Sequence, residues 1–303
     1  MIIITGPTAT GKTETAVRLA QTVGGEVISA DSMQVYKYMD IGTAKPTAAE
    51  MDGIKHYLID ELSPDEDYSV AVFQQKAHEY MARIYEAGKI PIVCGGTGFY
   101  INSLVYGNDF GAAESDNAYR DELYELARIE GSAALHDRLK EVDPESAVAI
   151  HENNTKRVVR ALEYFKQTGE KFSVNNTREK QRVPRRNCNV FVLDMPRDLL
   201  YERINLRVDK MMEQGLISEV KKLLDMGYDA KMVSMQGLGY KEVAEHLSGA
   251  VSIDAAVENI KLGTRHYAKR QLTWFRRQID GVWLDVTEFK NKNELAEHIK
   301  CLI

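Results

Sequence analysis

The stretch Gly6-Pro7-Thr8-Ala9-Thr10-Gly11-Lys12-Thr13 decides the fold of this chain. It fits G-x-x-x-x-G-K-[ST], and it follows the apolar run Ile2–Thr5 and precedes a helical pattern, the context expected of a phosphate-binding loop. The glycines let backbone N–H groups turn onto an anion, and Lys12 can neutralise phosphate oxygens. The Thr13 hydroxyl can complete a Mg²⁺ shell. All eight residues are therefore expected to bind a diphosphate, with Thr13 as a metal ligand.

Further apolar runs of strand length recur along the chain and are separated by helical patterns. They are Val27–Ala30, Ile90–Cys94, Val190–Leu193 and Val282–Leu284. Buried strands that alternate with helices are typical of a parallel sheet covered on both faces. We therefore predict an α/β fold, with a P-loop kinase-like parallel sheet as its core and helices on both faces.

One long segment breaks this alternation. From about Gly111 to Arg186 the pattern is helical and richly charged, with no strand-like run. We interpret this segment as an all-helical domain inserted between two strands. The expected division is residues 1–114 and 187–303 for the catalytic core and residues 115–186 for the insertion.

The composition of the chain argues against several other classes of protein. No stretch approaches the roughly 20 consecutive apolar residues that a membrane span needs, and Met1 runs directly into the first strand without room for a leader. We expect a cytoplasmic protein with no membrane contact. The three cysteines are scattered, and the seven histidines form no H-x-x-x-H pair, which argues against a disulfide framework or a transition-metal site.

A carboxylate and a hydroxyl follow two of the expected strands. Asp31 follows Val27–Ala30, and Thr97 follows Ile90–Cys94 after a pair of glycines. Because the carboxyl ends of parallel strands face the ligand crevice, both side chains are expected near the phosphate loop. Asp31 could act as a metal-shell carboxylate, as a general base or as the cap of a following helix, and its position alone leaves these roles open.

Positive charge is clustered although the chain carries a net charge of -6. One cluster contains Arg178, Lys180, Arg182, Arg185 and Arg186, and a second recurs at helical spacing at Lys261, Arg265, Lys269 and Arg276. Such runs are usually solvated faces. Two of them in one acidic protein favour a nucleic-acid partner.

At this point the motifs become familiar, because the chain resembles the tRNA dimethylallyltransferase (tRNA isopentenyltransferase) family over nearly its whole length. The matching pieces are GPTATGKT (6–13), DSMQVY (31–36), IGTAKP (41–46), HYLID (56–60), YSV (68–70), GGTGFY (95–100), NNTKRVVRALE (153–163), GLGYKE (237–242) and RHYAKRQLTWFRR (265–277). The phosphate loop alone fits many proteins, whereas DSMQVY, GTAKP and AKRQLTWFRR together are specific. We expect the bacterial type, without the C-terminal zinc finger of eukaryotic relatives.

The resemblance implies transfer of a dimethylallyl group from dimethylallyl diphosphate to N6 of the adenosine 3′-adjacent to the tRNA anticodon, with Mg²⁺ as cofactor and release of pyrophosphate. It implies that Asp31 takes the proton from N6 and that Thr97 hydrogen-bonds near the diphosphate. Lys12 would stabilise the leaving group. Arg120, at the start of the insertion, resembles a family arginine that reaches the active site.

The implied partner is the anticodon stem-loop of tRNA, contacted in part by the insertion, and we expect the protein to act as a monomer. The residues expected to contact tRNA are Asp31, Ser32, Met33 and Gln34 at a flipped adenine, Thr155, Lys156 and Arg157 at the anticodon arm, and Arg182, Arg265 and Lys269 in the two basic clusters. The sequence departs from the family at Tyr57, which stands where the family has a second histidine beside His56, and we attach no function to this pair.

Three rival functions share these features. A P-loop kinase for a small molecule or nucleotide would use the same loop and predicts ATP turnover. An RNA-binding regulator would bind RNA without modifying a base. A transferase acting on free adenine nucleotides would share the active site but would not need the insertion or the basic clusters.

Overall fold

The computed structural model describes residues 1–107, 117–180, 183–184 and 188–303. The chain divides into two compact units: a core unit of residues 1–108 and 185–303, and a helical unit of residues 109–184. The domain boundaries expected from the sequence, 114/115 and 186/187, stay predictions, because the residues at both joints lie outside the described ranges.

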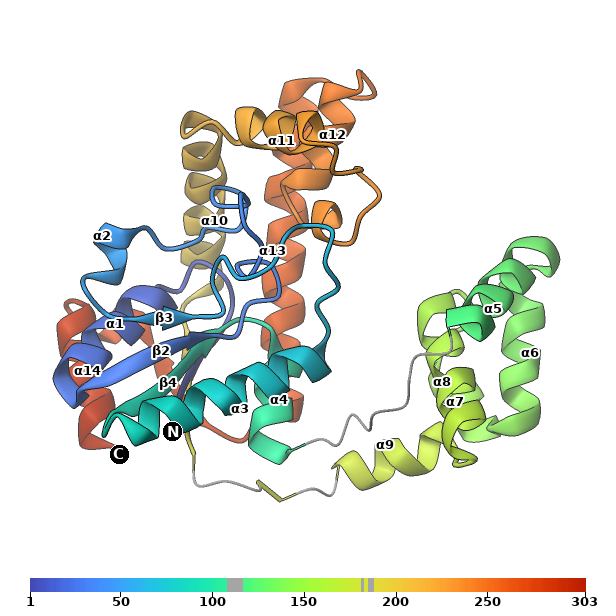
Figure 1. Ribbon diagram of the computed structural model, residues 1–303, viewed down its shortest axis with the longest axis horizontal. Coiled ribbons are helices and arrows are strands. Elements are labelled where there is room, and N and C mark those ends of the chain that lie inside the picture. The colour runs from blue at the N-terminus through green and yellow to red at the C-terminus, as the bar shows by residue number, and fades with distance from the viewer. Residues whose placement is uncertain (108–116, 181–182, 185–187) are drawn as a thin grey trace. The chain divides into compact units, whose positions relative to one another are not determined.

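The core unit is built on one six-stranded sheet, in the order β3-β2-β4-β1-β5-β6 (Figure 1). Every neighbouring pair of strands is parallel. The strands are β1 (Ile2–Thr5), β2 (Gly25–Ser29), β3 (His56–Tyr57), β4 (Ile90–Gly95), β5 (Asn189–Asp194) and β6 (Val282–Asp285). The five predicted strands are confirmed. The strand β3 has no signal in the sequence, because its two residues are only half-buried and form no apolar run.

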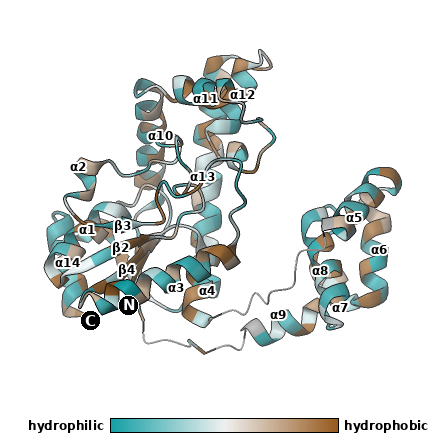
Figure 2. Cartoon of the chain, in the orientation of Figure 1, coloured by the Kyte–Doolittle hydropathy of each residue, from teal (hydrophilic) through white to brown (hydrophobic). Residues whose placement is uncertain are grey.

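Both faces of the sheet are covered by helices, as predicted. Successive side chains of a strand point to opposite faces, so Ile2 and Ile4 pack on one face and Ile3 on the other, and all three are buried. On the first face lie α1 (Lys12–Val23) and α14 (Lys292–Cys301). On the second lie α3 (Val70–Glu86) and α4 (Gly98–Tyr106). Figure 2 shows the result as hydrophobic strands β2 and β4 between helices that alternate hydrophilic and hydrophobic residues.

A second group of helices lies beyond the carboxyl ends of the strands. The long helices α10 (Arg197–Glu213) and α13 (Ile253–Gln278) pack against each other, with α11 (Leu216–Asp225) and α12 (Tyr240–Leu247) near their far ends (Figure 1). Their apolar side chains form a cluster that also buries Val35, Tyr36 and Met39 from the chain that follows β2. The short elements are α2 (Ala48–Met51) and two 3₁₀ turns, Ser234–Gln236 and Val286–Glu288.

The cluster is tied to the segment after β2 by one carboxylate. Glu219 accepts the backbone N–H groups of Asp40, Ile41 and Gly42 at 3.0, 2.8 and 3.1 Å. It also accepts the hydroxyl hydrogen of Tyr240 at 2.7 Å. The Tyr240 ring leaves no space for a side chain at residue 42, where a Cβ would lie 2.4 Å from a ring carbon. The IGTAKP and GLGYKE segments therefore form one packed unit.

A buried lysine, Lys45, also stabilises the segment that follows β2. Lys45 donates to the carboxylates of Asp40 and Asp60 at 2.6 and 2.5 Å, and to the Tyr36 carbonyl oxygen at 2.8 Å. Its side chain is only 4% exposed, so the paired charges offset the cost of burying the ammonium group.

The helical unit contains no strand among its described residues. It consists of α5 (Asn117–Glu130), α6 (Ser132–Val142), α7 (Pro144–Ala149), α8 (Thr155–Thr168) and α9 (Phe172–Lys180). Its own apolar core includes Leu123, Leu135, Leu139 and Leu162. The predicted all-helical insertion is confirmed in these residues.

Candidate active site

The phosphate-binding loop joins β1 to α1 with the geometry that its sequence predicts. Gly6, Ala9 and Gly11 have φ angles of 139°, 68° and 84°. At residue 6 a side chain is impossible, because a Cβ would lie 2.2 Å from the Leu193 carbonyl oxygen of β5. The Thr10 hydroxyl donates back to the Pro7 carbonyl at 3.0 Å, which closes the loop on itself.

Lys12 begins α1, and its ammonium group lies inside the loop, 2.7 Å from the Pro7 carbonyl oxygen. The pKa of Lys12 is lowered to about 8, chiefly by burial and also by the positive charge of Arg207, while Cys94 and Asp31 act in the opposite direction. Because burial disfavours the charged form of Lys12, a bound anion would stabilise this ammonium group. The loop is therefore prepared for a phosphate ligand.

A second cation at this loop escapes sequence analysis. Arg207 of α10 donates from Nη1 to the Thr8 hydroxyl at 3.3 Å. Burial lowers the pKa of Arg207, and the Glu50 and Asp31 carboxylates act in the opposite direction. No motif surrounds residue 207, so only the packing of α10 beside the loop reveals this arginine.

Asp31 lies at the carboxyl end of β2, beside the same loop. Its Oδ1 atom accepts the backbone N–H groups of Met33 and Gln34 at 2.8 and 3.3 Å. Asp31 therefore caps a turn rather than the helix that one sequence interpretation allowed. Burial raises the pKa of Asp31, and the two backbone hydrogen bonds, Lys12 and Arg207 partly oppose this rise. Capping leaves the general-base and metal-shell roles open.

Thr97 connects the ends of β2 and β4. Its hydroxyl oxygen accepts the Ser32 backbone N–H at 3.1 Å, and its own N–H donates to the Ala30 carbonyl at 3.2 Å. The strands approach this closely because residue 95 is glycine, where a Cβ would lie 2.2 Å from the Ala30 oxygen. The structure thus brings the two predicted residues Asp31 and Thr97 to adjacent turns.

The Gln34 side chain holds the chain that follows Asp31. Its Oε1 atom accepts the Ser29 hydroxyl at 3.1 Å, and its Nε2 atom donates to the carbonyls of Thr43 and Ala44 at 3.3 and 3.2 Å. The Met33 side chain reaches the GLGYKE segment, since a Cβ at residue 237 would lie 2.8 Å from Met33 Cε. Residues 31–34 are therefore held by contacts with β2, with the IGTAKP segment and with the GLGYKE segment.

Comparison with known proteins decides the family. The IPP transferase family model matches residues 34–278. The chain is 50% identical over 303 residues to the tRNA dimethylallyltransferase of Lachnoclostridium phytofermentans, covering 100% of this chain and 97% of that protein. It is 49% identical to that of Acetivibrio thermocellus, covering 99% of this chain and 96% of that protein. The chain belongs to the IPP transferase family.

Solved structures agree with this assignment to the IPP transferase family. The full-length tRNA isopentenylpyrophosphate transferase of Bacillus halodurans superposes with a TM-score of 0.74 at 46% identity, covering 99% of this chain and 95% of that one. A eukaryotic dimethylallyltransferase acting on tRNA gives a TM-score of 0.81 at 28% identity, covering 99% and 77% of the two chains. The resemblance read from the sequence motifs is confirmed.

In this IPP transferase family member, two of the four cations in the predicted basic stripe on α13 contact α10. Lys261 donates to Asp209 at 2.8 Å, and Arg265 donates to the Asn205 side chain at 2.6 Å. Lys269, one turn further along, is exposed. The stripe is therefore not the fully solvated outer face that the sequence pattern indicates, because two of its cations lie between the helices.

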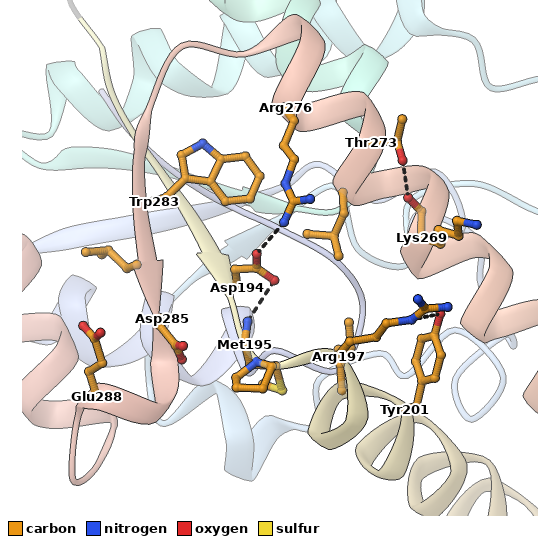
Figure 3. Close-up of a pocket in the computed structure, with 14 residues that line it drawn as sticks. Asp194, Met195, Arg197, Tyr201, Lys269, Thr273, Arg276, Trp283, Asp285 and Glu288 are labelled. Carbon is orange, nitrogen blue, oxygen red and sulfur yellow. Dashed lines mark hydrogen bonds and ion pairs between the residues drawn. The ribbon is translucent and has the colours of Figure 1, made fainter.

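Lys269 lines a pocket of ≈ 710 Å³ at the carboxyl ends of β5 and β6, between α10 and α13 (Figure 3). Arg276 crosses this pocket, with its guanidinium carbon 5.5 Å from the centre of the Trp283 ring and Nη2 3.4 Å from the Asp194 carboxylate. Charges of both signs line the pocket, so its residues do not by themselves specify an anion.

The remaining predicted residues of this IPP transferase family member lie in the helical unit. Arg120 donates from Nε to the buried Glu163 carboxylate at 2.6 Å. At the start of α8, Lys156 and Arg157 are exposed and Thr155 is half-buried. Arg182 lies outside the described residues. The proposed roles of all five residues in catalysis or tRNA contact stay predictions.

A magnesium ion would find few protein ligands here. Across the described ranges no three His, Cys, Asp or Glu side chains gather into a metal-binding group. The donors expected from the sequence are the Thr13 hydroxyl and the Asp31 carboxylate. This donor set fits Mg²⁺, which keeps several waters and commonly binds through one or two protein oxygens and the phosphates of a substrate.

Proposed function

We propose that this protein transfers a dimethylallyl group from dimethylallyl diphosphate to N6 of the adenosine 3′-adjacent to the anticodon in tRNA. The observation that carries the proposal is the meeting of two half-sites at one edge of the sheet. A cationic loop for a diphosphate lies at the end of β1, and the Asp31–Thr97 pair lies at the neighbouring ends of β2 and β4. One half-site suits a leaving group, and the other suits a nucleophile.

The loop half-site stabilises the leaving group. As the allylic C–O bond breaks, negative charge grows on pyrophosphate, and Lys12 and Arg207, which both contact the loop, would stabilise this charge together with loop amides. Preorganised donors of this kind are usually the largest contribution to catalysis. Bound Mg²⁺, held by Thr13 and the diphosphate oxygens, would supply further positive charge.

Asp31 serves the nucleophile. As N6 forms its bond to the allylic carbon, the amine becomes more acidic and releases one proton, which the Asp31 carboxylate accepts. Because burial raises the pKa of Asp31, this carboxylate is a stronger base than an ordinary aspartate. A positioned general base contributes about 10²–10⁴-fold to such a step.

The adenine would reach Asp31 only after leaving the stacked anticodon loop, at a cost of a few kcal/mol. Ser32, Met33 and Gln34 are proposed to receive it. Thr155, Lys156, Arg157, Arg182, Arg265 and Lys269 are proposed to contact tRNA. A change of the exposed pair Lys156 and Arg157 to alanine should lower the salt slope of tRNA binding by about two.

Three further parts of the proposal are a donor identified as dimethylallyl diphosphate, a monomeric state and a cytoplasmic location. Within the described ranges, no helix has the length and apolarity to cross a membrane. A substrate tRNA supports the cytoplasmic location. Size-exclusion chromatography with light scattering would test the monomer.

A transfer assay tests the proposed reaction. Purified protein, Mg²⁺ and labelled dimethylallyl diphosphate are incubated with unmodified tRNA, and with AMP in a parallel reaction. We expect label in tRNA and not in AMP, and its loss in Asp31→Ala while pyrophosphate binding remains. Equal labelling of AMP would favour the transferase of free nucleotides, and transfer of the γ-phosphate of ATP to an acceptor would favour the kinase, which family membership does not support.

A further inference from the structure

The two half-sites of the core unit are joined by one buried amide on α13. Gln271 is 7% exposed, and its Oε1 atom accepts the backbone N–H of Thr8 in the phosphate loop at 3.0 Å. Its Nε2 atom donates to the Gly96 carbonyl at 2.8 Å, directly before Thr97. One side chain thus contacts the donor loop and the acceptor turn.

The fit around this amide is tight and directional. A Cβ at residue 96 would lie 2.4 Å from Gln271 Nε2, so only glycine leaves room for the contact. The two partners also fix the orientation of the amide, because Thr8 supplies a donor and Gly96 an acceptor. A side chain at position 271 needs both an acceptor and a donor of similar length, and glutamine provides both.

Tyr267, one helical turn before Gln271, extends the connection to Thr97. The Tyr267 side chain lies near those of Thr97 and Gln271 and interacts with both, and burial is the main cause that raises the pKa of Tyr267. Thr97 in turn accepts the Ser32 N–H beside Asp31. A path of contacts therefore runs from the phosphate loop through α13 to the turn that carries the proposed base.

We propose that Gln271 is a positioning residue that sets the separation between the bound diphosphate and the acceptor amine. This inference rests on the proposed transfer reaction. Gln271 acts through Thr8 and Gly96, and it need not touch either substrate. In a displacement reaction the attacking and leaving atoms must be aligned, and a displacement of about 1 Å can cost about 10²-fold in rate.

The proposal separates binding from catalysis. Each half-site keeps its own groups in a Gln271→Met variant, because Lys12 and Arg207 remain at the loop and Asp31 remains on its turn. We expect pyrophosphate and tRNA to bind this variant within about threefold of the wild type. We expect its kcat to fall about 10²-fold, since only the alignment of the two half-sites is lost.

A Gln271→Glu variant adds a signature that a purely structural role would not give. A protonated carboxyl group has one acceptor and one donor, as the amide has, whereas the ionised form lacks the donor for the Gly96 carbonyl. The ratio of variant to wild-type kcat should therefore rise as pH falls. The same ratio for Gln271→Met should be independent of pH.

The matched control is Gln74→Met. The Gln74 amide is half-buried and donates to the Ser103 carbonyl at 2.8 Å, joining α3 to α4 away from the phosphate loop. We expect this variant to lose some stability and to keep its kcat within about twofold. It measures the general effect of removing an internal amide.

Titration calorimetry with pyrophosphate, tRNA filter binding, single-turnover transfer and thermal melts are measured on all four proteins. The proposal is overturned if Gln271→Met keeps wild-type kcat, or if kcat falls only in proportion to lost substrate binding or lost folded protein. A wild type that binds pyrophosphate and tRNA but transfers no dimethylallyl group would instead overturn the proposed function.

Discussion

The Thr97 hydroxyl oxygen lies 3.1 Å from the Ser32 backbone nitrogen and accepts its hydrogen. This single bond joins the turn after β4 to the turn after β2, two segments that lie 65 positions apart in the chain. Asp31 immediately precedes Ser32, so the position of the proposed base depends on a hydroxyl group from another strand. Thr97, which is proposed to face the ligand, thus also supports the turn that carries Asp31.

Removal of this hydroxyl should slow catalysis. In Thr97→Val the shape is kept but the Ser32 N–H loses its partner, at a cost of about 1–3 kcal/mol. We expect kcat to fall about 10- to 100-fold in single-turnover transfer. Thr97→Ser keeps the hydroxyl and should remain within about fivefold of wild type. A wild-type kcat in Thr97→Val would contradict this role of the hydrogen bond.

The acid side of the pH profile should report Asp31. Only the ionised carboxylate can accept a proton, so kcat/KM should fall as pH decreases through the pKa of Asp31. Because burial raises that pKa from its ordinary value of 3.8, this decline should begin at a higher pH than for an exposed aspartate. The residual activity of Asp31→Asn should lack this decline, and an unchanged acid limb would assign it to another group.

The alkaline side should report Lys12. Burial lowers the pKa of this ammonium group to about 8, and only its charged form neutralises a diphosphate. In the free enzyme kcat/KM for the donor should therefore fall as pH rises through about 8. Bound diphosphate stabilises the charge, so the same limb in kcat should move to higher pH. Lys12→Arg keeps its charge at all these pH values and should lose the limb, although its altered shape lowers the rate.

Local patterns in the sequence were sufficient to predict the core of the fold. Five buried strands are visible as apolar runs, because each strand of a parallel sheet is covered on both faces and carries no polar alternation. The phosphate loop, Asp31 and Thr97 could be placed by the rule that strand ends meet at one edge. His56–Tyr57 could not, since two half-buried residues leave no period to detect.

The side chains that hold the site residues in place could not be predicted in the same way. Arg207, Gln271 and Glu219 each act on segments between 175 and 263 positions away, through contacts such as that of Gln271 with Thr8. Arg207 and Glu219 lie outside every motif, and although Gln271 lies in the motif at 265–277, nothing in that motif shows which distant segments its side chain contacts. The stripe on α13 illustrates the opposite error, because regular spacing indicated a solvated face while α10 engages Lys261 and Arg265.

Glu219 offers a test of stability that is separate from catalysis. Its carboxylate accepts three backbone N–H groups from residues 40–42 and the hydroxyl of Tyr240. Glu219→Ala leaves these donors without their partner, so we expect the free energy of unfolding to fall by about 3 kcal/mol. Urea denaturation should show a lower midpoint with an unchanged slope.

Two further variants serve as controls for the stability lost in Glu219→Ala. Tyr240→Phe removes one of the four hydrogen bonds to Glu219 and keeps the ring against Gly42, so it should cost about 1 kcal/mol. Glu213→Ala removes an exposed glutamate near the end of α10 and should change stability by less than about 0.5 kcal/mol. If Glu219→Ala matched Glu213→Ala, water would be replacing the carboxylate, and Lys45, Gln34 and apolar contacts would be sufficient to hold the segment after β2.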